Sequence, residues 1–289
     1  MTALTDARSW HGEQLDLDAY LDRVDYHGDT SPTLSTLRAL HRAHVTNIPF
    51  ENLEMVLGRA IPLDVESLQD KMVRRPRGGY CYEHSKLFAA ALERLGFSVW
   101  GLAARVRVGT DLLRPATHAL LRVGTDETPD TGRTWICDVG FGRDPLEPVE
   151  LADGTEITPD GWRFRLERQT PVPGAEEWML RSLGADGWFD MHGFTLDPRY
   201  AVDYTVANHY MSTHPSSPFA NRLLVQQMGP GALYALAATE LTATHPDGTV
   251  DTWQLKADEV PQTLADVFRI TLPEEDMARV VAAIDGLRR

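Results

Sequence analysis

The N-terminal third of the chain places its apolar residues at helical spacing. One stripe recurs every three or four residues and comprises Leu17, Tyr20, Leu21 and Val24. A second stripe follows Ser31-Pro32, a favourable N-cap and first-turn pair, and comprises Leu34, Leu37 and Leu40. The pattern predicts two packed helices in this part of the chain.

A break and a third helical stripe follow. Gly78 and Gly79 interrupt regular structure, and Gly96 is of the type that commonly follows a helix C-terminus. The stripe between them comprises Leu87, Phe88, Ala91, Leu92 and Leu95. Cys81 is therefore expected at a helix N-terminus.

From residue 97 the pattern changes from helix to strand. Runs rich in β-branched and aromatic residues, separated by Gly, Pro and Asp, cover residues 99–108, 118–123 and 135–141. Similar runs follow at 162–166, 178–183, 223–227, 233–244 and 250–255. They predict an antiparallel sheet or small barrel that extends through the later runs. Pro273 then opens a last helix, whose apolar face comprises Met277, Val280, Val281 and Ile284. The expected fold class is α+β.

Composition and charge exclude some classes of function but do not identify one. The 289 residues are 43% apolar and 24% charged, which is ordinary for a globular enzyme. The formal charge of −14 repels a phosphate backbone, so we expect no nucleic-acid partner. We find no secretory signal in the first ten residues and no apolar run long enough to span a membrane. With only Cys81 and Cys137, a disulfide framework is excluded, and we expect a reducing, cytoplasmic location.

Cys81 is the candidate nucleophile, because a thiolate at a helix N-terminus is favoured by the helix dipole and by a neighbouring histidine. His118 begins an apolar strand that is followed by the run containing Asp138. A hairpin between the two strands would let Asp138 orient the imidazole of His118, as the acid of a catalytic triad does. Spacing alone is weak evidence for this triad, because an ordinary structural His and Asp are common at such positions.

Four short sequence segments, three of which contain these residues, resemble those of a known protein family. They are Arg-Gly-Gly-Tyr-Cys-Tyr-Glu at 77–83, Asn-Ile-Pro-Phe-Glu-Asn-Leu at 47–53, Thr-His-Ala at 117–119 and Cys-Asp-Val-Gly-Phe-Gly at 137–142. In order and separation these segments resemble the signatures of the arylamine N-acetyltransferase family, and residues 212–219 resemble a further one. The family pattern usually has Asn four residues after the cysteine, where this chain has Ser85.

The resemblance implies a papain- or transglutaminase-like core in three parts. These are a helical bundle at 1–96 with the cysteine, a β-barrel domain at 97–205 with the His and Asp, and an α/β lid at 206–289. It also implies acetyl-coenzyme A as cosubstrate, no metal, and an arylamine, arylhydrazine or arylhydroxylamine as acceptor. The acetyl group would pass through Cys81 in a ping-pong cycle, with His118 taking the proton of the amine.

Further roles rest on the same resemblance. The acceptor is expected to contact Phe50, Tyr80 and Phe141, and coenzyme A to contact Gly140, Phe141, Gly142, Ser212 and Thr213. Each also has a plainer explanation: core packing for the aromatic residues, a turn for the glycines, and a helix cap at 216–218 for the last segment. Glu51 and Arg77 are expected to form an ion pair that braces the cysteine turn. The backbone N–H of Cys81 is the natural first oxyanion donor.

Other activities use the same residues. An amide synthase of the family would load a polyketide chain from a carrier protein onto Cys81 and close a macrolactam. A cysteine peptidase or transglutaminase would use the same triad on an amide, and a non-catalytic binding protein would leave Cys81 unreactive. A zinc site from Cys81, His84, His118 and Asp138 is disfavoured, because the chain has two cysteines and no C-x-x-C pair.

Overall fold

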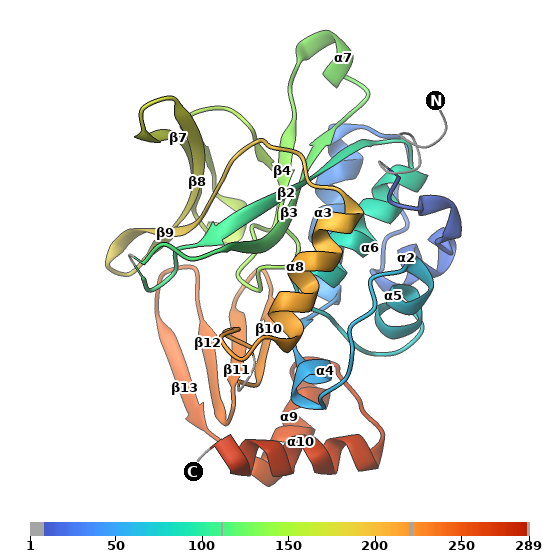
Figure 1. Ribbon diagram of the computed structural model, residues 1–289, viewed down its shortest axis with the longest axis vertical. Helices are drawn as coiled ribbons and strands as arrows, with labels where there is room; N and C mark the ends of the chain where they lie inside the picture. The colour runs from blue at the N-terminus through green and yellow to red at the C-terminus, as the bar shows by residue number, and fades with distance from the viewer. Residues whose placement is uncertain (1–8, 111, 220–221, 288–289) are drawn as a thin grey trace.

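The computed structural model describes residues 9–110, 112–219 and 222–287, which fold into helices and two antiparallel sheets (Figure 1). Helices dominate up to residue 94, and strands dominate from there to residue 194. The last part adds a long helix, a second sheet and two further helices. The α+β class expected from the sequence is therefore confirmed.

The N-terminal part contains more helices than the three predicted. After the short η1 (Gly12–Gln14) these are α2 (Leu17–Arg23), α3 (Leu34–Asn47), α4 (Leu53–Val56), α5 (Val65–Met72) and α6 (Cys81–Arg94). The predicted cap of α3 at Ser31-Pro32 is wrong. Thr33 caps this helix, because its hydroxyl accepts the N–H of Thr36 at 3.2 Å. The helices α4 and α5 are too short for periodicity to reveal them.

Helix α6 is the buried axis of the molecule. Its side chains are buried on every face from residue 81 to residue 92, so the apolar stripe read from the sequence understates its burial. It packs against β2 and β3 on one side and against α2 and α5 on another. Because neighbours enclose the whole first turn, the position of Cys81 is fixed from several directions.

One antiparallel sheet of eight strands forms the middle of the protein. Its strands are β2 (Ser98–Val106), β3 (Ala116–Gly124), β4 (Trp135–Cys137), β5 (Val149–Glu150), β6 (Thr155–Ile157), β7 (Phe164–Val172), β8 (Ala175–Gly184) and β9 (Gly187–Phe194), in the spatial order β5-β4-β3-β2-β9-β8-β7-β6. The short α7 (Thr128–Thr131) lies between β3 and β4, and η2 (Pro159–Gly161) precedes β7. The predicted hairpin of β3 and β4 is present, with Leu121 opposite Cys137.

The expectation that this sheet continues through the later runs is confirmed for 162–166 and 178–183, which overlap β7 and β8, and is wrong for the runs from residue 223 onward. Helix α8 (Ala201–Thr213) follows β9 and leads to a second sheet (Figure 1). That sheet has the order β1-β10-β11-β12-β13, formed by β1 (Phe50–Glu51), β10 (Leu224–Met228), β11 (Leu233–Ala237), β12 (Glu240–Thr244) and β13 (Val250–Gln254). The predicted single run at 233–244 is a hairpin, since Ala238 at φ 53° turns the chain.

Helix α8 escaped the sequence analysis because its apolar residues do not follow one buried face. Val202 and Val206 are exposed, whereas Asn208 is buried. The division of the chain into three parts at residues 96 and 205 stays a prediction, and the second of these points lies within α8.

Two hydrophobic cores hold the layers together. The larger surrounds α6 and the first sheet. The smaller lies between the second sheet and the helices α9 (Val260–Asp266) and α10 (Glu274–Leu287), with η3 (Ala257–Glu259) before α9. Leu53 and Leu57 of the N-terminal part belong to this smaller core, so β1 and α4 join the two ends of the chain. Within the described ranges, no helix has the length and apolarity needed to cross a membrane.

Candidate active site

Cys81 is the first residue of α6, as the sequence predicted. The helix start is fixed by Glu83, whose Oε2 accepts the N–H of Tyr80 at 3.1 Å and whose Oε1 accepts from Lys71 Nζ at 2.8 Å. The Sγ of Cys81 lies 3.9 Å from the carbonyl oxygen of Thr117, so β3 runs directly beside it. The thiol is thus held at the positive end of the helix dipole, next to the strand that carries His118.

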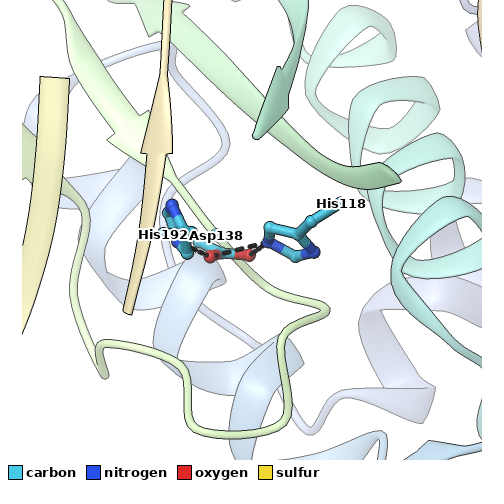
Figure 2. A group of neighbouring side chains, drawn as sticks. All are labelled: His118, Asp138 and His192. Carbon is cyan, nitrogen blue, oxygen red and sulfur yellow. Dashed lines mark hydrogen bonds and ion pairs between the residues drawn. The ribbon is translucent and has the colours of Figure 1, made fainter. Parts of the chain in front are cut away.

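Asp138 lies between two imidazoles (Figure 2). The Nε2 of His118 is 3.0 Å from both carboxylate oxygens of Asp138, and the Nε2 of His192 is 2.7 Å from Oδ2. Both histidines therefore donate from Nε2. For His118 this leaves Nδ1 available to Cys81, which lines the same cavity and whose interaction raises the pKa of His118. All three members of the His–Asp–His cluster are buried.

The charges in this cluster favour the protonated form of His118. Burial alone would lower the pKa of His118, but the charge and hydrogen bonds of Asp138, together with Cys81, raise it to about 10. Burial likewise opposes ionisation of Asp138, yet His118 and His192 hold the pKa of its carboxyl well below the usual range. The imidazolium is therefore the resting form near neutral pH, and it supplies the positive charge that an adjacent thiolate needs.

The thiol and the imidazole open into a cavity of about 520 Å³. Phe50 and Phe141 form aromatic walls, and the ring of Phe141 meets His118 edge-on at 4.9 Å between centroids. The lining includes the cationic residues Arg114, Arg143 and Arg222. No carboxylate lines this cavity in the part of the chain that the structure describes. A strongly acidic protein thus holds the Cys81 thiol in a cationic, aromatic cavity.

Comparison with known proteins agrees with this geometry. A family model described as N-acetyltransferase matches residues 33–277. The arylamine N-acetyltransferase of Mycobacterium tuberculosis H37Rv is 36% identical over 267 residues, which cover 90% of this chain and 91% of that protein. The chain belongs to the arylamine N-acetyltransferase family.

Solved structures of the family superpose closely on this chain. The Nocardia farcinica arylamine N-acetyltransferase has a TM-score of 0.92 at 48% identity, covering 96% of this chain and 98% of that one. The Mycobacterium marinum arylamine N-acetyltransferase in complex with CoA has a TM-score of 0.84 at 34% identity, covering 94% and 99%. The expected family fold is therefore confirmed.

The residues assigned from the family resemblance separate into two groups in space. Phe50, Gly140 and Phe141 line the cavity beside the nucleophile. Those that do not line it are Tyr80, Gly142, Ser212 and Thr213. Tyr80 is fully buried, and its hydroxyl donates to Asn208 Oδ1. This hydrogen bond ties the residue before Cys81 to α8.

Ser212 and Thr213 lie at the C-terminal end of α8, where their hydroxyls donate to helix carbonyls. The acceptors are Asn208 O at 2.7 Å and His209 O at 2.6 Å. The alternative of a helix cap at residues 216–218 is wrong, since a turn and not a helix follows α8. Ser217 instead donates to Met211 O at 2.6 Å and accepts the N–H of Phe219 at 3.2 Å. The segment therefore closes the end of α8.

The two glycines of the 140–142 segment have identifiable backbone reasons. A Cβ on Gly140 would lie 2.8 Å from the Cα of Cys81, so only glycine lets this loop approach the nucleophile so closely. Gly142 has φ +92°, in the region where other residues are strained. Both observations favour a structural role for the glycines, whatever they contact in a bound donor.

The ion pair expected beneath the cysteine turn is present. Arg77 Nε and Nη2 donate to Glu51 Oε1 at 2.9 and 2.7 Å, and Arg77 Nη1 lies 2.9 Å from Glu54 Oε1. Ser85, the departure from the family pattern, donates to the carbonyl of Ala119 at 3.0 Å. The serine therefore supplies its own link between α6 and the strand of His118.

Metal binding has little support from these contacts. The cluster of His118, Asp138 and His192 has donor atoms within 4.8 Å of one another, a spacing that suits an ion. However, the Asp138 oxygens already accept hydrogen bonds from both imidazoles. His84, a member of the zinc alternative, has Nδ1 2.9 Å from His44 Nε2 and Nε2 3.1 Å from the carbonyl of Pro49. Its ring nitrogens are thus committed to the fold.

The sequence analysis missed His192. It lies in β9 opposite Val106 of β2, and the pairing of β2 with β3 brings it beside Asp138 and His118. Burial lowers its pKa and the charge of Asp138 opposes this only partly, so the ring is a neutral donor. Its local sequence, Met-His-Gly, matches no spacing rule. Only the sheet order reveals it.

We expect His192→Phe to slow acetylation of Cys81 by roughly 10- to 100-fold. Asp138 Oδ2 would lose its buried donor, and such a loss costs about 1–3 kcal/mol. His192→Gln keeps an N–H donor and should retain most of the rate. Single-turnover acetylation of the two variants is the measurement. Equal rates for His192→Phe and the wild type would show that Asp138 needs only His118.

Proposed function

We propose that this protein transfers an acetyl group from acetyl-coenzyme A to an aromatic amine, hydrazine or hydroxylamine through an acetyl-Cys81 intermediate. The observation that carries the proposal is the position of His118, which is hydrogen-bonded to Asp138 and lines the same aromatic cavity as Cys81. The names of the relatives agree, and one from Salmonella typhimurium is an arylamine N-acetyltransferase and N-hydroxyarylamine O-acetyltransferase.

In the first half-reaction the Cys81 thiolate attacks the thioester carbonyl. The new C–S bond forms, the bond to the coenzyme A sulfur breaks, and the leaving thiolate takes the proton of the His118 imidazolium. The backbone N–H of Cys81 at the start of α6 is the natural donor to the oxyanion of the tetrahedral intermediate. Asp138 keeps the imidazole in the tautomer that leaves Nδ1 facing Cys81.

In the second half-reaction the amine nitrogen attacks acetyl-Cys81. His118, now neutral, takes a proton from the amine at Nδ1 as the C–N bond forms. The C–S bond then breaks, which releases the amide and restores the thiolate–imidazolium pair. The walls formed by Phe50 and Phe141 suit a flat aromatic acceptor.

The cationic lining supports a site for the phosphates of coenzyme A. Arg114 and Arg222 are exposed residues of the cavity lining, whereas Arg143 is half-buried. Arginine suits phosphate because its planar group donates several hydrogen bonds. We include these arginines in the donor site, together with Gly140 and Phe141 of the same cavity lining. Ser212 and Thr213 are weaker candidates, because their hydroxyls are engaged within α8.

We expect the double variant Arg114→Glu, Arg222→Glu to raise KM for acetyl-coenzyme A about tenfold or more, because two attractive charges become repulsive. The KM for N-acetyl-S-acetylcysteamine, which has no phosphate, should stay within about twofold. Arg168→Glu, which alters an exposed arginine of β7, is the matched control. An equal change for both donors would exclude a phosphate site here.

Initial-rate kinetics test the proposed cycle. With acetyl-coenzyme A and an arylamine varied together, double-reciprocal plots should be parallel, since one product leaves before the second substrate reacts. Intersecting lines would require both substrates to bind together and would exclude the acetyl-enzyme route. Cys81→Ala should be inactive. Cys137→Ala, which alters the other buried thiol, should keep the parallel pattern.

No specific observation favours the amide synthase or a peptidase over acetyl transfer. We also propose a cytoplasmic location, which the unpaired state of both cysteines supports.

A further inference from the structure

Asp144 is a buried carboxylic acid that the proposed cycle does not use. It lies two residues after Gly142 and is 4% exposed. Its Oδ1 accepts the N–H of Phe141 at 2.6 Å and its Oδ2 accepts the N–H of Gly142 at 3.0 Å. Across the described ranges, no Lys, Arg or His nitrogen lies within ion-pair distance of this carboxyl. Its contacts are directed at one short stretch of backbone.

The backbone segment at 140–142 contacts both members of the proposed reacting pair, Cys81 and His118. Gly140 packs against the Cα of Cys81, at a distance where a Cβ would collide. The ring of Phe141 meets His118 edge-on at 4.9 Å and His192 at 5.2 Å. Gly142 at φ +92° turns the chain back so that both N–H groups face Asp144. The orientation of the His118 ring therefore depends on where Phe141 is held.

The surroundings make this an unusual place for a carboxyl group. Burial and the charge of Asp138 raise the pKa of Asp144 to about 8, although the two backbone N–H groups and His118 act against this. The negative charge of Asp138 therefore disfavours the ionised form of the Asp144 carboxyl. A carboxyl group offers one oxygen to each of the two N–H groups, whereas the side chain of asparagine has a single acceptor oxygen.

We propose that Asp144 is a positioning residue for the nucleophile. By holding the N–H groups of Phe141 and Gly142, it keeps the Phe141 ring against His118, and so keeps the imidazole facing Cys81. The role does not depend on which acceptor or acyl donor the enzyme uses. It rests on the proposed function only in taking Cys81 and His118 as the reacting pair.

The test is a double-mutant cycle on the reactivity of Cys81 toward iodoacetamide. We expect Asp144→Ala and Phe141→Ala each to slow alkylation about tenfold, because both leave the imidazole free to turn away. If Asp144 acts through Phe141, the double variant should be no slower than the slower single variant. Asp144→Asn keeps one carbonyl acceptor and should recover part of the rate.

A control must distinguish a lower stability of the fold from a changed orientation of the His118 ring. Leu264→Ala, in the smaller core far along the chain from the site, should destabilise the fold by about 2–5 kcal/mol and leave alkylation unchanged. Independent, multiplicative effects of the two site variants would overturn the proposal, as would an unchanged rate in a folded Asp144→Ala protein. Iodoacetamide needs neither coenzyme A nor an amine, so this outcome is separate from any failure of acetyl transfer.

Discussion

Asp138→Asn is expected to lower kcat/KM for acetyl transfer by about four orders of magnitude while the protein stays folded. The Asp138 oxygens accept N–H groups from two histidines, and an amide can accept with only one of its two polar atoms. The amide nitrogen would face an imidazole N–H. His118 would then relieve the clash by changing tautomer, which places a proton on the nitrogen that faces Cys81 and removes the base.

A His–Asp pair elsewhere in the chain provides the matched control. His245 Nε2 lies 3.0 Å from Asp251 Oδ2 in an exposed position on the second sheet. Asp251→Asn should leave kcat/KM within about twofold. Comparison of kcat/KM for the two variants, with circular dichroism to confirm folding, tests the assignment. A loss of less than about tenfold in Asp138→Asn would mean that Asp138 does not set the tautomer of His118.

A steep loss of stability between pH 6.5 and 4 is the second large effect that we expect. Burial lowers the pKa of His41 and of His84 from 6.5 to about 4, and it lowers those of His44 and His192 as well. The folded state therefore binds these protons less readily than the unfolded state. Their stabilising contribution is complete above pH 6.5 and is lost as the pH falls towards 4, at up to about 3 kcal/mol each for His41 and His84.

The contacts explain why protonation is costly. Tyr20 donates to His44 Nδ1 at 2.8 Å, His44 Nε2 lies 2.9 Å from His84 Nδ1, and His84 Nε2 lies 3.1 Å from the carbonyl of Pro49. Each ring donates once and accepts once along this line. An added proton on either ring would set a donor against a donor. Since Phe50 of the cavity wall follows Pro49, activity should fall with stability.

Other titratable groups also change the free energy of unfolding with pH, and the direction of each effect follows from its pKa shift. Burial raises the pKa values of Asp144 and Glu83, so these carboxyls favour the folded state as the pH falls. His118, raised to about 10, contributes fully below 6.5 and loses its contribution only as the pH rises through 10. The four histidines with lowered pKa values outnumber the two opposing carboxyls. The free energy of unfolding should therefore decrease as the pH falls from 6.5 towards 4.

Urea unfolding at pH 7.5, 6, 5 and 4.5 measures the slope of the free energy of unfolding against pH. His41→Leu removes one buried titrating group, and it should reduce the slope between pH 6 and 4.5 by about 1 kcal/mol per pH unit. His27→Gln, at an exposed histidine, should leave the slope unchanged. A wild type equally stable at pH 7.5 and 5 would contradict the buried, neutral state of these histidines.

The sequence predicted the positions of the candidate site residues better than it predicted the order of the strands. The position of Cys81 followed from a helical stripe and a Gly-Gly break, and the meeting of His118 with Asp138 followed from two adjacent strand runs. Both are local features, and local pairing of consecutive strands is common. The Phe50 and Phe141 walls came from the family resemblance, and both line the cavity.

The features that were missed depend on contacts between distant parts of the chain. His192 reaches Asp138 only because β9 pairs with β2 across a large sequence gap. The second sheet uses two residues of the N-terminal part, Phe50 and Glu51, as its edge strand. Asp144 was not singled out from the sequence, since nothing local indicates that its carboxyl would be buried. Periodicity cannot supply such long-range pairings.

The most direct test of the account is the intact mass of the protein after brief exposure to acetyl-coenzyme A without an amine. We predict a single added acetyl group on the wild type and on Cys137→Ala, and none on Cys81→Ala. Addition of an arylamine should remove it as the acetylated amine appears. An unmodified wild type that still acetylates amines, or an acetyl group that persists on Cys81→Ala, would contradict the central role of Cys81.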